Sequence, residues 1–257
     1  MSMRLNRRQV EQFFSVGYVV QPDVFTPNEV REMRGAFERL QRTAYELRQS
    51  GMHRGSLFVL ADPTGVAADP SPVRIQRIVW CGAAEPILSE YGRDPRLLSM
   101  ASQLLGSESM SQLINQAHFK IPGDGVEFPW HQDSTHRRYG RECWNDVNGR
   151  GSYVQTVVAV DPVTEENGPL QFIPGSCKLG HAGLPEGQLP LGRVDPRTAV
   201  SATMSAGSVV LFGPYTYHRS TPNRSQQPRR IFLNGFAHPA ANTRIYPGDG
   251  AGRVVGA

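Results

Sequence analysis

The chain has 257 residues, with 27 Lys and Arg against 23 Asp and Glu and a formal net charge of +4 at pH 7. So small a charge, with signs that alternate along the chain, argues against a nucleic-acid-binding protein. No apolar run approaches the roughly 18 residues of a membrane helix, and the N-terminus lacks the apolar core of a signal peptide. We therefore expect a cytoplasmic protein that binds neither nucleic acid nor membrane, and the sequence leaves its oligomeric state open.

Helical patterns dominate the first 110 residues. Asn6 is placed to cap a first helix, which Gly17 ends before a strand-like segment. Thr26 begins a capping box with proline at the first helical position. A third helix is expected over residues 94–105. We expect residues 1–110 to supply helices and outer strands that support a core further along the chain.

After residue 111 the pattern changes to short β-type runs separated by Gly, Pro and Asn turns. Strands that recur without long helices between them predict an antiparallel sandwich or barrel. We therefore expect a single domain over residues 1–257, mainly β with flanking α-helices, with its core in 111–240. Residues 182–200 are expected to form a loop, and residues 241–257 a poorly structured tail. The expected strands are 112–121, 154–160, 170–173, 209–212 and 231–236.

The strongest chemical signal is His131-Gln132-Asp133. In a strand, positions i and i+2 point to the same face, so an imidazole and a carboxylate would lie side by side. A third ligand is available in His218, which follows another apolar strand. Two histidines and one carboxylate on one face of an ion form the facial triad of non-haem Fe(II) oxygenases. An isolated His-x-Asp pair is weak evidence, because such pairs also occur by chance.

The spacing after the third ligand strengthens the interpretation. Arg229 lies eleven residues beyond His218, at the start of an expected strand. A bidentate arginine in a buried pocket is a natural anchor for a small dicarboxylate. The open positions on iron and this anchor together describe a site for 2-oxoglutarate, with its 2-oxo acid end on the metal and its far carboxylate on Arg229.

These motifs together resemble those of the phytanoyl-CoA dioxygenase family of Fe(II)/2-oxoglutarate-dependent oxygenases. The resemblance covers most of the chain, from Gly17 to the strand that ends near Phe236. It implies a double-stranded β-helix of jelly-roll, cupin-like type that uses Fe(II), 2-oxoglutarate and O₂. The motifs that carry it are His131-Gln132-Asp133, Asn167-Gly168-Pro169-Leu170, Ile173-Pro174-Gly175-Ser176, and His218-x-Ser220 with Asn223 and Arg229-Arg230.

The resemblance also assigns roles to individual residues. It implies that His131, Asp133 and His218 are the catalytic metal ligands. It implies that Arg229 binds the distal carboxylate of 2-oxoglutarate. Since adjacent strand residues point to opposite faces, we expect Arg230 to point outward, with the reverse assignment left open. Further contacts to the cosubstrate are expected from Ser220, Lys120 and Gln116.

The carboxylate ligand bears on the type of reaction. Related halogenases replace this carboxylate with a small residue so that halide can bind iron. Asp133 is present in this chain. The sequence therefore favours hydroxylation or another oxidation over halogenation.

The substrate is expected to contact residues 136–151, which follow the first ligand pair and contain four arginines. We expect this segment to begin beside the metal and to cover the pocket as a lid, with a solvated basic loop as the alternative. It also loosely resembles a segment of bacterial aminophosphonate dioxygenases. The expected substrate is therefore small and anionic, an aminophosphonate or an amino-acid-like molecule. The candidate contacts are Arg137, Asn148, Arg150, Gln155 and Thr156, with only one of the last two facing inward.

Three alternatives remain at this point. The substrate could be a larger natural product or a carrier-bound acyl group. The chain could also be a non-catalytic binding or sensing protein on the same fold. A zinc hydrolase is the third alternative, although no glutamate lies at the spacing of a zinc protease motif. The three widely spaced cysteines suggest neither a disulfide framework nor a thiolate zinc site.

Overall fold

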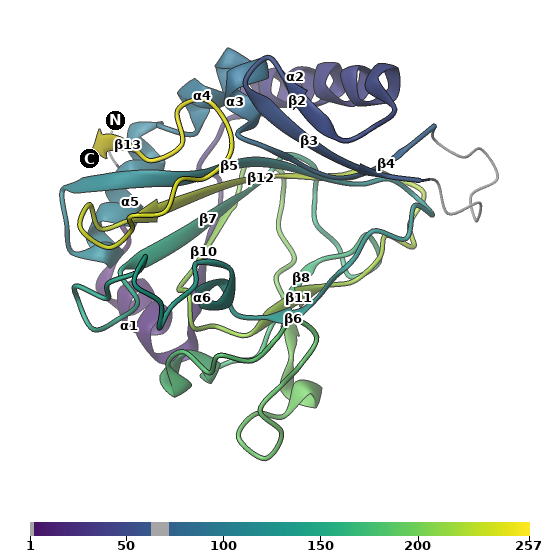
Figure 1. The fold of residues 1–257 in the computed structure, drawn as a ribbon. Coiled ribbons are helices and arrows are strands. Elements are labelled where there is room, and N and C mark those ends of the chain that lie inside the picture. The colour runs from purple at the N-terminus through teal and green to yellow at the C-terminus, as the bar shows by residue number, and fades with distance from the viewer. Residues whose placement is uncertain (1–2, 63–71) are drawn as a thin grey trace.

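Two antiparallel sheets dominate the computed structural model, which describes residues 3–62 and 72–257 (Figure 1). The strands are β1 (Tyr18–Gln21), β2 (Gly51–His53), β3 (Ser56–Ala61), β4 (Arg74–Val79), β5 (Ser109–Lys120), β6 (Phe128–His131), β7 (Tyr153–Ala159), β8 (Leu170–Phe172), β9 (Val200–Ser201), β10 (Val209–Phe212), β11 (His218–Ser220), β12 (Arg229–Ala237) and β13 (Arg253–Gly256). The large sheet has the order β1-β10-β7-β12-β5-β4-β3-β2, with β13 also paired to β5. The small sheet has the order β6-β11-β8-β9.

The helices begin and end at the residues that the sequence marks. Asn6 and Thr26 both form complete capping boxes, and Gly17 and Gly106 end their helices in the left-handed conformation. Within the described part of the chain, no helix has the length and apolar character that a membrane crossing needs. The helices are α1 (Arg7–Val16), α2 (Pro27–Leu47), α3 (Cys81–Ala84), α4 (Pro86–Tyr91), α5 (Pro95–Leu105) and α6 (Asp133–His136), with short 3-10 turns η1 (Ser176–Leu179) and η2 (Pro196–Thr198).

The large sheet packs on both faces, as strand β7 illustrates. Val158 packs with Phe37 of α2, whereas its neighbour Val157 packs with Phe172 of the small sheet. Figure 1 shows α2, α3 and α4 on one side of the large sheet and the small sheet on the other. The alternation of a strand therefore decides which side chains enter the space between the sheets. The five expected strands are confirmed, with ends shifted by a few residues.

Residues 241–257 are built into the fold, so the expectation of a poorly structured tail is wrong. Asn242 forms a β-bridge with Trp144, and β13 extends the large sheet beside β5. Tyr246 and Val255 are each only 8% exposed. The apolar residues of this segment are few, and they find partners only on elements far away in the chain. Local composition cannot reveal such contacts.

Gly248 allows the C-terminal segment 241–257 to pack closely against Trp80. Its φ is +105°, and an added Cβ would lie 2.1 Å from the Cβ of Trp80. We expect Gly248→Ala to lower the free energy of unfolding by roughly 2–4 kcal/mol, measured by urea denaturation. Gly252→Ala is the matched control, because Gly252 also has a positive φ, of +82°, but nothing lies within 4 Å of an added Cβ. Equal losses in the two variants would contradict a specific contact at Gly248.

Candidate active site

A cavity of about 350 Å³ lies between the two sheets. Its walls come from inward-facing positions of the large sheet and from β6, β8 and β11 of the small sheet. Apolar side chains form much of the wall, as is usual for a small-molecule site. They include Leu57, Phe128, Val157, Leu170, Phe212 and Ile231.

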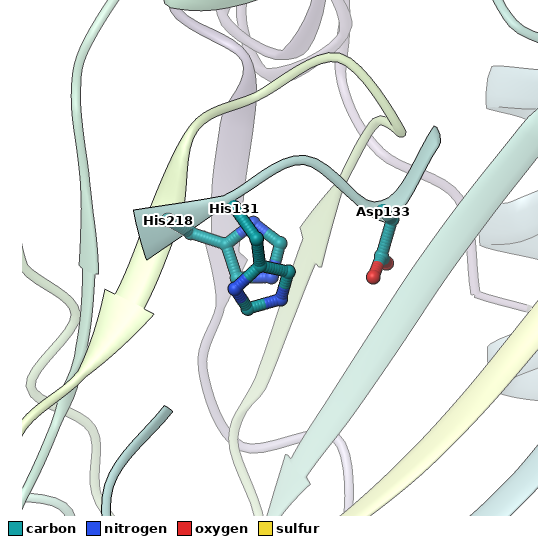
Figure 2. A group of neighbouring side chains, drawn as sticks. All are labelled: His131, Asp133 and His218. Atoms are coloured by element: carbon teal, nitrogen blue, oxygen red, sulfur yellow. The ribbon is translucent and has the colours of Figure 1, made fainter. Parts of the chain in front are cut away.

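The three expected metal ligands converge on this cavity (Figure 2). His218 stands directly opposite His131 in the antiparallel pairing of β11 with β6, and the two ring centroids are 4.2 Å apart. The candidate ligand atoms of His131, Asp133 and His218 all lie within 4.8 Å of one another. β6 ends at His131, and Asp133 is the first residue of α6. The carboxylate therefore reaches its place through the start of a helical turn, and not through the strand alternation that we expected.

Both histidines are oriented by the backbone. The Nδ1 atom of His131 lies 2.7 Å from the carbonyl oxygen of Pro129, and the Nδ1 atom of His218 lies 2.9 Å from that of Thr216. A carbonyl oxygen only accepts, so each ring carries a proton on Nδ1, and Nε2 is the nitrogen that can bind a metal. Burial, together with the neighbouring His131, lowers the pKa of His218 to about 3. His218 is therefore neutral at pH 7, as a metal ligand must be.

Asp133 completes a donor set that fits a divalent cation. Burial opposes ionisation of this carboxylate, yet its pKa lies below the ordinary value because His218 and Arg137 favour the charged form. Asp133 is 6% exposed, and its Oδ2 atom is buried without a hydrogen-bond partner within residues 3–62 and 72–257. A buried anionic oxygen without a partner is costly, and a bound cation would remove that cost. Two imidazoles and one carboxylate suit iron.

Arg229 provides a second group that lacks a partner in the same cavity. It is 1% exposed, and its Nη2 atom donates to the carbonyl oxygen of Gly168 over 2.9 Å. Its Nε and Nη1 atoms are buried and make no hydrogen bond with any described residue. Burial lowers the pKa of Arg229 to about 9. A carboxylate entering the cavity would supply the missing acceptors in bidentate geometry.

The neighbouring arginine faces the opposite way. Arg230 forms a buried ion pair with Asp161, with an Nε to Oδ2 distance of 2.7 Å, and also contacts Glu38. This guanidinium packs towards the helices and is already neutralised there. Of the two arginines, Arg229 is therefore the one that lines the cavity, as strand alternation predicts.

The other cosubstrate candidates are placed differently. Ser220 and Gln116 line the cavity. Lys120 is fully buried but does not line it, because its ammonium group donates to the carbonyl oxygen of Thr221. Lys120 therefore lies behind the cavity wall and makes no direct contact with a ligand in the cavity. Burial is the main cause that lowers the pKa of Lys120 to about 6, and Arg229 adds to this effect.

The buried Lys120 predicts a pH dependence of stability. Between pH 6 and the ordinary lysine pKa of 10.5, the unfolded chain keeps a proton that folded Lys120 has lost, so the free energy of unfolding rises with pH. Lys120→Met removes this contribution, whose slope is at most about 1.4 kcal/mol per pH unit. We expect the stability advantage of the variant over the wild type to shrink as pH rises from 6 to 10. Urea denaturation at several pH values measures this, and parallel pH profiles would contradict it.

The substrate candidates divide into two groups. Arg137 and Gln155 line the cavity. Thr156 faces the helices and donates to the carbonyl oxygen of Asn234 at 3.1 Å, because it alternates with Gln155 on β7. Asn148 donates to the carbonyl oxygen of Leu105 over 3.1 Å.

Arg150 lies with its guanidinium 4.5 Å from the ring centroid of Phe14, in a different hollow. Arg150, Asn148 and Thr156 are therefore not brought to the cavity, and we leave them out of the proposed site. Only the start of the expected lid, at His136 and Arg137, borders the cavity. The later residues turn back against the helices, a path that the loop sequence alone does not encode.

Other polar and charged residues also line the cavity. Arg77 lies on β4, where the alternation of polar and apolar residues favours a strand with one solvent-facing side, and a substrate contact from Arg74 or Arg77 is the alternative. Glu186 comes from the 182–200 loop, whose backbone is fixed to β6 by a 2.8 Å hydrogen bond from Gly187 to Trp130. Arg244 and Tyr246 come from the C-terminal segment. The sequence around Glu186, Arg244 and Tyr246 carried no signal that would have identified them.

Comparisons with known proteins point to one family. The sequence matches the family described as Phytanoyl-CoA dioxygenase (PhyH) over residues 13–231. The ectoine dioxygenase of Bordetella bronchiseptica is 27% identical over 252 residues, which cover 89% of this chain and 74% of that protein. The L-proline trans-4-hydroxylase of Streptomyces griseoviridis is 29% identical over 205 residues, covering 67% and 70%. The methylphosphonate hydroxylase of Gimesia maris is 26% identical over 233 residues, covering 90% and 80%.

A solved structure of a protein complexed with 2-oxoglutarate has a similar fold. The crystal structure of EvdO2 from Micromonospora carbonacea var. aurantiaca, complexed with 2-oxoglutarate, superposes with a TM-score of 0.66 at 25% identity. The match covers 96% of this chain and 97% of that one. The likeness extends over nearly the whole of both chains, and it confirms the jelly-roll fold expected from the sequence.

Proposed function

Because the chain belongs to the phytanoyl-CoA dioxygenase family of Fe(II)/2-oxoglutarate-dependent oxygenases, we propose that it hydroxylates an unactivated C–H bond of a small anionic substrate. The enzyme uses Fe(II), 2-oxoglutarate and O₂. An amino acid or an aminophosphonate is the class of substrate that we propose. The metal ligands in this proposal are His131, Asp133 and His218, and Arg229 is the anchor of the cosubstrate.

One observation carries the proposal. The same cavity contains a carboxylate oxygen of Asp133 and two nitrogens of Arg229 that are all buried and lack partners among the described residues. These groups have opposite charges, so they suit different ligands. The carboxylate and two imidazoles suit a cation, while the guanidinium suits an anion such as the distal carboxylate of 2-oxoglutarate.

The bound iron and 2-oxoglutarate supply the oxidising power with O₂, and succinate and CO₂ are the other products. The chain itself orients the groups that would hold the metal and the cosubstrate. Pro129 and Thr216 fix the imidazole tautomers through their carbonyl oxygens. Gly168 holds Arg229 through Nη2, so that Nε and Nη1 stay directed at the cosubstrate, with Ser220 beside it. The apolar walls exclude water from the reacting C–H bond.

The size of the cavity and the relatives support a small substrate. About 350 Å³ must accommodate both the cosubstrate and the substrate. The names of three relatives specify ectoine, L-proline and methylphosphonate, which are small molecules with an acid group. These observations favour the small substrate over a larger natural product or a carrier-bound acyl group. Family membership argues against the zinc hydrolase and the non-catalytic protein.

The test is an anaerobic titration of the protein with Fe(II) and 2-oxoglutarate. We expect the weak visible charge-transfer band of an Fe(II)–2-oxoglutarate complex, and a shift of that band with a substrate from a panel of amino acids and aminophosphonates. Exposure to O₂ should then give succinate and the hydroxylated substrate in equal amounts. Absence of the band at full iron occupancy would contradict the assignment of Arg229 as the anchor of 2-oxoglutarate and, with it, the proposed reaction.

A further inference from the structure

Two more arginines line the cavity and form no ion pair with the described residues. Arg137 follows α6, is 8% exposed, and has a buried Nε atom that makes no hydrogen bond with the described residues. Arg77 lies on β4, two strands away from Arg229 in the large sheet, and its half-buried guanidinium makes no hydrogen bond within residues 3–62 and 72–257. Neither guanidinium is within ion-pair distance of a described carboxylate. Arg77 and the Nε atom of Arg137 therefore keep N–H donors for a ligand.

The remaining arginines of the cavity wall are already engaged. Arg219 donates to the Gln171 side chain over 2.8 Å and lies over the Trp130 ring. Arg244 donates to the carbonyl oxygen of His136 over 3.1 Å and lies over a tyrosine ring. This difference separates Arg77 and Arg137 from the other cations of the wall.

The charge balance of the cavity leaves an anion missing. Once Asp133 is assigned to the metal and Arg229 to the cosubstrate, Glu186 is the only acid that the cavity wall contains among the described residues. Glu186 is exposed, and although its charge acts on Arg77 from a distance, it forms no ion pair with any described residue. The guanidinium of Arg137 is instead held over the rings of Tyr153 and Tyr246, at 5.2 and 5.3 Å from their centroids. These rings fix its position but do not neutralise it.

We propose that Arg77 and Arg137 together bind the acid group of the substrate, a carboxylate or a phosphonate. This inference rests on the proposed function. Two guanidinium groups from separate elements offer several N–H donors to one oxyacid group, which gives orientation as well as affinity. Because Arg137 follows the metal ligand Asp133 by only four residues, an acid group held there brings the adjacent carbon atoms close to the metal site. The pair thus determines which molecules are hydroxylated.

The test compares acids with their neutral amides on the holoenzyme. Affinities are measured from the shift of the anaerobic Fe(II)–2-oxoglutarate band with L-proline, L-prolinamide and methylphosphonate, for the wild type and for Arg77→Gln, Arg77→Lys and Arg137→Gln. In the wild type we expect at least one acid to bind, and to bind more tightly than the amide. Arg77→Gln and Arg137→Gln should each weaken acid binding about 10- to 100-fold, with Arg77→Lys in between and amide binding unchanged. Whether the carboxylate or the phosphonate binds better identifies the acid group.

Two matched variants control for general effects. Arg74→Gln changes an arginine of the same strand that does not line the cavity, and Arg138→Gln changes the exposed neighbour of Arg137. Both should keep the affinity for acids. If no acid shifts the band, or if Arg77→Gln weakens acid and amide equally, the proposal is overturned. If Arg77→Gln and Arg137→Gln still give the band with Fe(II) and 2-oxoglutarate, the proposed function stands even though the proposal for the two arginines fails.

Discussion

His131→Ala is expected to abolish hydroxylation and to weaken Fe(II) binding by more than about 100-fold. The variant removes one of the three proposed protein ligands. His218, which lies opposite residue 131 in the sheet, and Asp133 cannot replace the lost imidazole from their fixed positions. Iron content after dialysis and the intensity of the charge-transfer band measure the loss. Succinate formation should fall in parallel, because 2-oxoglutarate reacts only on the metal.

His136→Ala is the control for His131→Ala. The ring of His136 lies 4.9 Å from that of His131, and His131, His136 and Glu186 form a second group whose ligand atoms lie within 4.8 Å of one another. His136 and Glu186 are exposed, whereas Asp133 and His218 are buried. We expect His136→Ala to retain iron. Loss of iron in His136→Ala but not in an Asp133→Asn variant would move the metal to the second group.

The sequence predicted those parts of the site whose geometry is set by local rules. Period-two alternation predicted that Arg229 and Arg230 face opposite ways, as do Gln155 and Thr156, because each pair lies within one regular strand. The helix caps were equally local: Asn6 needs only the next few residues to satisfy its hydrogen bonds. These predictions required no knowledge of the tertiary fold.

The rest of the cavity depends on contacts between distant segments. Tyr246 reaches the cavity because Gly248 packs on Trp80 and β13 pairs with β5. Glu186 reaches it because its loop is tied to β6. Such contacts are favourable only once the sheets exist, so no short window of sequence contains them. The same reason explains why residues 136–151 do not cover the cavity as a lid. Asn148 is hydrogen-bonded to the end of α5, a helix more than forty residues earlier in the chain.

Arg229→Gln is expected to raise the KM for 2-oxoglutarate by about 100-fold, with a smaller effect on kcat at saturation. The distal carboxylate would lose its only buried guanidinium partner in the proposed site, while the metal ligands stay unchanged. Without ligand, the variant should be at least as stable as the wild type. The reason is that it removes a buried cation whose Nε and Nη1 atoms have no described partner.

Arg230→Gln separates the binding of the cosubstrate from the stability of the fold. It breaks the buried ion pair with Asp161 and should lower the free energy of unfolding by about 3 kcal/mol, yet leave the KM for 2-oxoglutarate unchanged. The two adjacent substitutions thus have opposite expected patterns, which steady-state kinetics and urea denaturation measure independently. A rise in KM for Arg230→Gln with none for Arg229→Gln would reverse the assignment. Because the two arginines differ only in the face of β12 that they occupy, this comparison tests the strand register and the cosubstrate anchor together.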